Sequence, residues 1–375
     1  MTLVVDNSVD GPRIHLLAIG VGSYRHLPGG EEPVRHDTLG LRQLSGPPLS
    51  ALAFVDFVAL RLRHPSARLS TVELLLSPAQ AWERQGLSTT VDVPNLANVV
   101  RAFESWYDRC DRDPDSVGLF YFCGHGVQRE APLLLVEDFG RSRLSMLENA
   151  VDILPTFYGM AACAARTQYF FVDACREVPH QLLGRLNGSA RVLTDQEVLG
   201  EDRDCALLFA TSGGHKAYGI PQQPTRFTAA LIRAWDGLGA RQDVNRWVVD
   251  FGGLQRAVTA LLRRDDPAAP RQQPQSFGTS GDAVLQLCPE PPVVPLRVAC
   301  LPSEALRSPG VTARLARLGS SAAMALTPSA SGWQAELPAG VYQLDVGIQP
   351  PYRPPAPEEI AAWPPYCDLE ISVTP

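Results

Sequence analysis

The sequence predicts an α/β domain with three layers and a mainly parallel sheet, followed by a small C-terminal β-sandwich module. The first domain is predicted by continuously apolar segments that alternate with segments of helical spacing. Strands without apolar–polar alternation are buried on both faces, so helices must cover both sides of the sheet. The second module is predicted by a change near residue 289, after which prolines are frequent and apolar runs are short.

The elements of the first domain follow in alternating order. Apolar runs that end in turn-forming residues predict strands at 14–22, 72–76, 117–123, 132–136, 169–172 and 205–210. Apolar residues at helical spacing predict helices at 50–62, 94–107, 153–165, 227–235 and 254–263. Pro94 suits the first turn of the second helix, because a first turn leaves that backbone N–H unpaired in any case.

The C-terminal part is predicted to form its own module. Residues 1–288 would form the first domain, 289–295 a proline-rich linker and 296–375 the sandwich. Short strands are expected at 296–300, 333–337, 341–346 and 369–373, with a hairpin turn at 337–341. The module would either dock a regulatory partner or brace the first domain.

The composition and net charge indicate which classes of partner are not expected. The formal net charge is −7 and no basic cluster marks a surface for nucleic acid. Without a membrane-spanning apolar stretch or a secretion-signal pattern, we expect no membrane insertion and a cytoplasmic location. The eight cysteines form no Cys-x-x-Cys pair and no ligand cluster is visible, so we expect mostly buried thiols and no cofactor or metal.

Two predicted strands end in residues that carry chemistry. Strand 117–123 is followed by Gly124-His125-Gly126, and strand 169–172 by Asp173-Ala174-Cys175. Catalytic groups in such sheets gather at the carboxyl ends of the strands. An imidazole there can take the proton of a thiol and then protonate a leaving amine. The backbone amides of Gly126 and Cys175 are candidates for binding the oxyanion of a tetrahedral intermediate.

Other residues compete for these roles. Cys123 lies two positions before His125, but it continues the apolar strand and is expected in the core. His180 and His215 are interpreted as loop residues rather than as bases. The long polar stretch 176–204 is expected to gate the cleft and to be a site of self-cleavage.

On these two blocks the chain resembles the caspase-like cysteine peptidases, nearest to prokaryotic metacaspase-like members. The resemblance covers residues 12–287, and His125 precedes Cys175 by 50 positions, the spacing found in caspases. It implies that Cys175 forms an acyl-enzyme with a protein substrate cleaved in trans, with His125 as acid and base. By analogy, it also suggests bacterial defence or regulated cell death, with a gasdermin-like protein as the substrate.

The resemblance also indicates which kind of residue precedes the scissile bond in the substrate, the position called P1. Asp173 stands where metacaspase-like members carry an aspartate that contacts a basic P1, whereas caspases have glutamine there. Ser212 and the segment Ala217-Tyr218-Gly219 resemble the region that lies beside the substrate. Gly219 replaces the arginine with which caspases bind a P1 aspartate. A basic P1 is therefore favoured, and a small or apolar P1 stays open.

Several alternatives remain at this stage. The fold could serve as a catalytically idle scaffold or binding protein, or as another thiol-dependent hydrolase or transferase. Leu49-Ser50 stands where metacaspase-like members often have Asn-Asp, so a second acidic group in the P1 pocket is not expected. Calcium activation, which occurs in some metacaspases, stays open because no acidic cluster has the spacing of a calcium loop.

Overall fold

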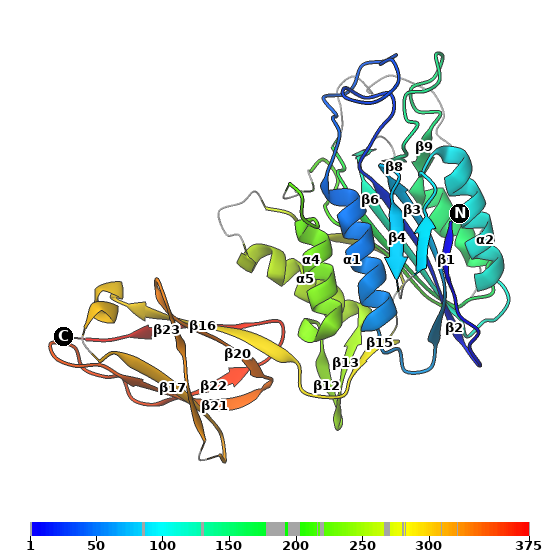
Figure 1. Cartoon of the computed structure of the whole chain (residues 1–375). Coiled ribbons are helices and arrows are strands. Elements are labelled where there is room, and N and C mark those ends of the chain that lie inside the picture. The colour runs from blue at the N-terminus through cyan, green and yellow to red at the C-terminus, as the bar shows by residue number, and fades with distance from the viewer. Residues whose placement is uncertain are drawn as a thin grey trace. The chain divides into compact units, whose positions relative to one another are not determined.

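The structure is a computed structural model, and its contacts divide the chain into two compact units. The first comprises Met1–Ile232 and Leu261–Val284, and the second comprises Arg233–Ala260 and Leu285–Pro375. Figure 1 shows their elements along the chain. The structure describes residues 2–84, 87–128, 131–177, 192–193, 203–215, 217, 221–265, 271–279, 281, 283–308, 310–320 and 322–374.

The first unit contains the main sheet. Within the described residues this sheet has seven strands, in the order β1-β3-β2-β6-β10-β11-β14. The strands are β1 (Leu3–Asp6), β2 (Arg13–Val21), β3 (Arg68–Ser77), β6 (Val117–Gly124), β10 (Thr167–Ala174), β11 (Asp204–Phe209) and β14 (Gln275–Thr279). The five inner strands run parallel, and β1 and β14 pair antiparallel at the edges. A mainly parallel sheet is therefore confirmed.

Helices pack on both faces of this sheet. Phe54 of α1 stacks on Tyr121 with ring centroids 4.5 Å apart, whereas Trp106 of α2 packs against Phe120. Adjacent strand residues point to opposite faces, so α1 and α2 cover opposite sides. This double cover explains why the inner strands are continuously apolar. The helices of the first unit are α1 (Gly46–Leu60), α2 (Leu96–Cys110), α3 (Ile153–Gly159), η1 (Met160–Ala162) and α4 (Arg226–Arg233), whose last residue groups with the second unit. The helix η3 (Ala234–Leu238) belongs to the second unit, and α5 (Phe251–Asp265) is divided between the two units.

Two small sheets accompany the main sheet. Strands β7 (Gly126–Gln128), β8 (Pro132–Leu135) and β9 (Ala150–Asp152) pair antiparallel directly after the end of β6. Strands β4 (Ala81–Arg84) and β5 (Leu87–Thr90) form a hairpin. The β7–β9 sheet holds the chain on both sides of His125, because the Leu135 N–H donates to the His125 carbonyl.

The second unit contains a β-sandwich, as predicted. Its sheets have the orders β19-β20-β16-β23 and β18-β17-β21-β22, and they share one apolar core. A third sheet, β12-β13-β15, places Trp247 against Trp363 with centroids 5.5 Å apart. The elements are β12 (Arg241–Asp243), β13 (Arg246–Asp250), β15 (Val284–Cys288), β16 (Val293–Leu301), η4 (Ser303–Arg307), β17 (Thr312–Arg317), β18 (Ala323–Ala325), β19 (Thr327–Ser329), β20 (Gly332–Pro338), β21 (Gly340–Gly347), β22 (Glu358–Ala362) and β23 (Cys367–Ser372).

One local prediction was wrong. The turn at 337–341 joins no hairpin, because β20 pairs with β16 and β19 whereas β21 pairs with β17 and β22. The chain crosses there from one sheet of the sandwich to the other. The helix expected at 153–165 is also shorter, since α3 ends at Gly159 and a 3₁₀ turn follows.

The predicted domain boundary at 289 remains a prediction. Residues 293–295 of the expected linker lie in β16, and residues 233–260 group with the second unit. The eight cysteines are free thiols, all buried except the partly exposed Cys175 and Cys205. Among the described residues, no helix is long and apolar enough to cross a membrane.

Candidate active site

The pairing of β6 with β10 brings the two predicted catalytic blocks together. The strands run parallel in a continuous register that ends with Asp173 opposite Cys123 and Ala174 opposite Gly124. His125 and Cys175 are therefore the next residues after two paired strand ends. Neighbouring strands are about 4.8 Å apart. The sheet thus sets an imidazole beside a thiol at its carboxyl edge, as the sequence predicted.

A cavity of about 310 Å³ lies at this edge. Its walls include His125, Cys175, Asp173 and Ala217, four of the residues predicted for the site. The remaining wall comes from Gln43, Leu44, Ser45, Gly46, Pro47, Cys123, Gly124, Pro221 and Thr225. The cavity thus combines the strand ends with the segment that precedes α1.

His125 is held by main-chain and aromatic partners. Its Nε2 lies 2.6 Å from the Arg42 carbonyl, and its backbone N–H donates to the Tyr24 hydroxyl at 2.6 Å. A carbonyl can only accept, so Nε2 carries the proton in the neutral ring and Nδ1 is left as the basic nitrogen. Burial lowers the pKa of His125, and the bond to Arg42 opposes this shift. The ring is therefore neutral over a wider pH range than an exposed histidine.

Gln43 fixes the segment that supplies these partners. Its Oε1 accepts the Tyr24 N–H at 2.7 Å, and its Nε2 donates to the carbonyls of Tyr24 and Pro28. One side chain thereby ties both ends of the loop between β2 and α1. The Arg42 carbonyl and the Tyr24 hydroxyl are positioned by the same set of bonds.

Cys175 lies partly exposed just beyond β10. The Ala217 N–H lies 3.3 Å from its Sγ, and the thiol lies 3.6 Å from the Ala217 carbonyl. An N–H donated to sulfur favours the thiolate. The next residue pairs with the same loop, since the Arg176 N–H donates to the His215 carbonyl at 3.0 Å. His215 and Ala217 are thus bonded alongside the predicted nucleophile.

Gly126 begins β7, next to the chain that follows Cys175. Leu135 donates to the His125 carbonyl, and Gln128 donates to the carbonyl of Glu177 on the other edge of β7. Amides alternate in direction along a strand, so the Gly126 N–H points to the same edge as that of Gln128. A Cβ at Gly126 would lie 2.7 Å from the Cys175 carbonyl. This position therefore requires glycine.

Asp173 lies at the wall of the cavity as a buried carboxylate. Its Oδ2 accepts hydrogen bonds from the hydroxyls of Thr225 and Thr228, the latter at 2.7 Å. Burial raises its pKa, and the hydroxyl bonds oppose that shift. Only 2% of Asp173 is exposed to solvent. The carboxylate thus lies in the cavity wall, largely shielded from solvent.

Arg176, the residue after Cys175, contacts three strands. It is 5% exposed, and its guanidinium lies 4.4 Å from the Phe209 ring centroid. It donates to Gln128 Oε1 at 3.0 Å and to Gln275 Oε1 at 2.7 Å. These contacts reach β7, β11 and β14, so Arg176 fixes the direction in which the chain leaves β10.

The described residues that compete with Cys175 and His125 for the catalytic roles lie outside the cavity or in surroundings that do not suit those roles. Cys123 is 1% exposed, and burial together with Asp173 raises its pKa well above the ordinary value. His215 lies 3.2 Å from the Ser212 hydroxyl and does not line the cavity. Ser212, which was predicted to lie beside the substrate, is also absent from the cavity wall. Tyr218, His180 and most of the stretch 176–204 lie outside the described residues.

Some supporting residues were not predicted as site residues from the sequence. Arg42 acts through its main chain, which leaves no side-chain pattern to detect. Thr225 and Thr228 approach Asp173 from a segment some fifty positions further along the chain. Tyr24 supplies its hydroxyl from about a hundred positions before His125 in the sequence. Among the described residues, no group of three or more His, Cys, Asp or Glu side chains is arranged to hold a metal ion.

A parallel α/β sheet with a histidine and a cysteine at adjoining strand ends defines the caspase-like class of proteins. The family model of the caspase domain matches residues 77–279, more than half of the 375 residues. The chain belongs to the caspase family, whose members are cysteine peptidases.

Individual relatives are distant. The chain is 26% identical over 248 residues to the uncharacterized protein y4kE of Sinorhizobium fredii, covering 64% of this chain and 72% of that protein. It is 25% identical over 238 residues to a probable protease of a Desulfuromonadales bacterium, covering 56% of this chain and 27% of that protein. The crystal structure of caspase-1 from Spodoptera frugiperda has a TM-score of 0.42 and 14% identity, covering 76% of this chain and 96% of that one. The bacterial protease therefore extends well beyond the shared region.

Replacing Arg176 tests its role in positioning Cys175. Arg176→Met removes the hydrogen bonds to both glutamines while keeping an unbranched apolar chain. We expect the free energy of unfolding to fall by at least about 3 kcal/mol, because hydrogen bonds from a charged donor are lost in the interior. Denaturant unfolding measures this change.

The same variant should also alkylate more slowly at Cys175 under conditions in which it remains folded. Arg203→Met serves as the matched control, because Arg203 donates to the Cys163 and Ala165 carbonyls away from the cavity. An unchanged alkylation rate in Arg176→Met would contradict a positioning role. Equal losses of rate in both variants would do the same.

Proposed function

We propose that the chain is a cysteine endopeptidase that cleaves a partner protein in trans through an acyl-enzyme on Cys175. The single observation that carries this proposal is the cavity that His125 and Cys175 line together at the carboxyl edge of a caspase-family sheet. The bond from His125 Nε2 to the Arg42 carbonyl supports the role of Nδ1 as base. The setting in bacterial defence or regulated cell death, with a gasdermin-like substrate, rests on analogy alone.

The proposed reaction has two stages. His125 Nδ1 takes the thiol proton, and Cys175 Sγ attacks the peptide carbonyl carbon. The amides of Gly126 and Cys175 stabilise the oxyanion, and His125 then passes its proton to the leaving amine as the C–N bond breaks. Water, deprotonated by His125, then attacks the thioester carbonyl, and the C–S bond breaks to release the acid product. His125 returns the proton to Cys175 Sγ, which restores the free thiol.

We propose a basic P1 residue, bound by Asp173. The carboxylate lines the cavity and is ordered by two threonine hydroxyls, which supports its use as a fixed negative charge. A small or apolar P1 is the second candidate, favoured by the deep burial of the carboxylate and its existing hydrogen bonds. In that case Asp173 only orders the strand end.

The peptidase proposal is tested with fluorogenic peptides varied at P1. Wild-type chain should cleave a subset of them, and Cys175→Ala should abolish cleavage because no acyl-enzyme can form. Cys205→Ala is the matched control, since Cys205 is the other partly exposed thiol and should be dispensable. If peptide cleavage survived Cys175→Ala, the proposal would fail. If wild type neither cleaved peptides nor reacted with a peptide-based thiol probe, the idle scaffold would replace it.

The specificity proposal is tested by Asp173→Asn, which keeps the shape and the hydroxyl bonds. We expect the preference for arginine over leucine at P1 to fall roughly 10- to 100-fold, since a hydrogen bond to a charged group is lost. The measurement is the ratio of kcat/KM for the two peptides. Asp204→Asn, at the amino end of β11, should leave the ratio unchanged. An unchanged ratio in Asp173→Asn would favour the apolar P1.

The preference for arginine should also depend on pH. Burial raises the pKa of Asp173, so its charge is lost at a higher pH than for an exposed aspartate. As pH falls through that pKa, the arginine-to-leucine ratio of kcat/KM should fall. Titration of His125 affects both substrates alike and cancels in the ratio. A ratio that stays constant between about pH 7 and pH 4 would remove Asp173 from recognition.

A further inference from the structure

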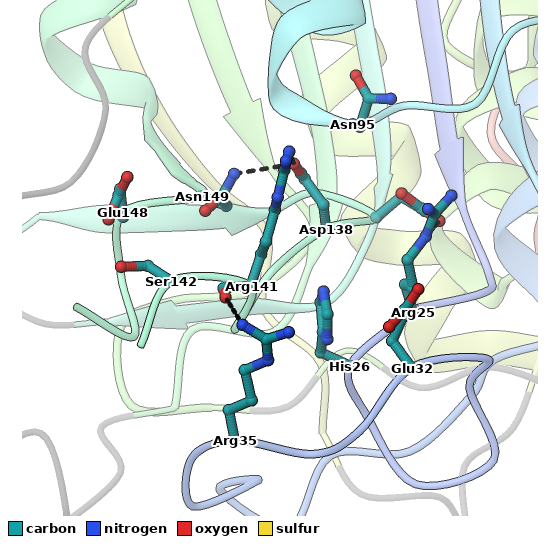
Figure 2. Close-up of a pocket in the computed structure, with 11 residues that line it drawn as sticks. Arg25, His26, Glu32, Arg35, Asn95, Asp138, Arg141, Ser142, Glu148 and Asn149 are labelled. Atoms are coloured by element: carbon teal, nitrogen blue, oxygen red, sulfur yellow. Dashed lines mark hydrogen bonds and ion pairs between the residues drawn. The ribbon is translucent and has the colours of Figure 1, made fainter. Parts of the chain in front are cut away.

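A second cavity lies in the first unit, with a volume of about 640 Å³. Its walls come from the loop between β2 and α1, from the segment between β8 and β9 and from Asn95 before α2 (Figure 2). The volume falls within the range of roughly 300–1,000 Å³ that ligand sites occupy. None of its lining residues belongs to the active-site cavity, so it is a separate feature.

Glu137 is a buried carboxylate in the wall of this cavity, and one of its oxygens lacks a hydrogen-bond partner within the described part of the chain. It is 6% exposed, and its Oε1 accepts from Arg25 Nε at 3.1 Å. Its Oε2 is buried and has no hydrogen-bond partner among the described residues. A buried carboxylate oxygen is normally satisfied by a donor. Because Glu137 lines the cavity, a cationic N–H group entering it would lie beside this carboxylate.

The neighbouring carboxylate, Asp138, differs from Glu137 because both of its oxygens have hydrogen-bond partners. Asp138 Oδ2 accepts from Asn149 Nδ2 at 2.9 Å, and its Oδ1 accepts from the Leu96 N–H at the start of α2. Asp138 is therefore occupied in holding the fold together. Of the two buried carboxylates in this wall, Glu137 is the one with an acceptor oxygen left over, whereas Glu32 and Glu148 also line the cavity but are exposed.

Two arginines in the same wall supply the opposite charge. The Arg141 side chain is 70% exposed and reaches toward Asp138, with 3.9 Å between Nη1 and Oδ2. Arg35 Nη1 donates to the Arg141 carbonyl at 3.1 Å, so its fork lies against neutral backbone (Figure 2). Guanidinium groups bind carboxylates in preference to neutral acceptors. They also disfavour a bare metal cation in this cavity.

We propose that this cavity docks a peptide segment of a partner protein that carries a lysine or arginine next to acidic residues. The basic side chain meets the Glu137 carboxylate, and the acidic side chains meet Arg35 and Arg141. An open cavity of this size, with both signs of charge in its wall, fits several consecutive side chains better than one small ion. This binding does not depend on the proposed peptidase activity.

The test selects pentapeptides from a random library on the full-length Cys175→Ala chain, which binds without turnover. Counter-selection uses the chain with Cys175→Ala and Glu137→Gln, a change that keeps the shape and the bond from Arg25. Sequences that combine a basic with an acidic residue should be enriched. No enrichment over the counter-selection, or enriched peptides without a basic residue, would overturn the proposal.

The best peptide is then measured by fluorescence anisotropy. Glu137→Gln should weaken binding at least tenfold, and replacing the basic residue of the peptide by norleucine should have the same effect. The two changes together should cost no more than either alone. Glu104→Gln, an exposed carboxylate on α2, is the matched control and should bind normally.

Binding that Asp173→Asn abolishes and Glu137→Gln leaves intact would place the peptide in the active-site cavity and overturn the proposal. Thermal unfolding of each variant verifies that it is folded. Since no turnover is measured, failure of the peptidase proposal leaves this result standing, and the reverse also holds.

Discussion

Strands β6 and β10 pair in parallel, residue for residue, from Val117 opposite Thr167 to Gly124 opposite Ala174. The candidate site depends on this pairing more than on any other contact. A shift of one residue would move one of the two reactive side chains to the other face of the sheet. The register is specified by buried aromatic residues on both faces, since Phe120 stacks on Phe170 with centroids 4.9 Å apart. The packing of the core thus sets the chemistry at the edge.

The loop between β2 and α1 adds what the strands cannot provide. Regular strands place side chains, but the partner of His125 Nε2 is a main-chain carbonyl, which only an irregular segment can turn toward the ring. Gln43, near the end of this segment, fixes its conformation by bonding to Tyr24 and Pro28 near its start. The same loop carries Arg25 and Arg35 into the second cavity. A single ordered loop therefore lines both cavities.

Sequence patterns predicted the strand ends well, because buried parallel strands are continuously apolar and stop abruptly at Gly124 and Asp173. They predicted the partners of those residues poorly. Asp173 meets Thr225 and Thr228 only after an intervening stretch and another strand, and nothing local marks that approach. The prediction of a hairpin at 337–341 was wrong for a related reason. Residues that favour a tight turn do not say whether the next strand pairs or crosses to another sheet.

The structure also distinguishes the two cysteines near His125. Cys123 lies inside β6 and opposite Asp173, so burial and a neighbouring carboxylate both disfavour its thiolate. Cys175 lies one residue beyond the end of β10, where the strand no longer covers it, and the Ala217 N–H points to its sulfur. A thiolate forms more readily beside an amide donor than beside a carboxylate. The position of each cysteine relative to its strand end therefore favours Cys175 over Cys123 as the proposed nucleophile, although both thiols line the same cavity.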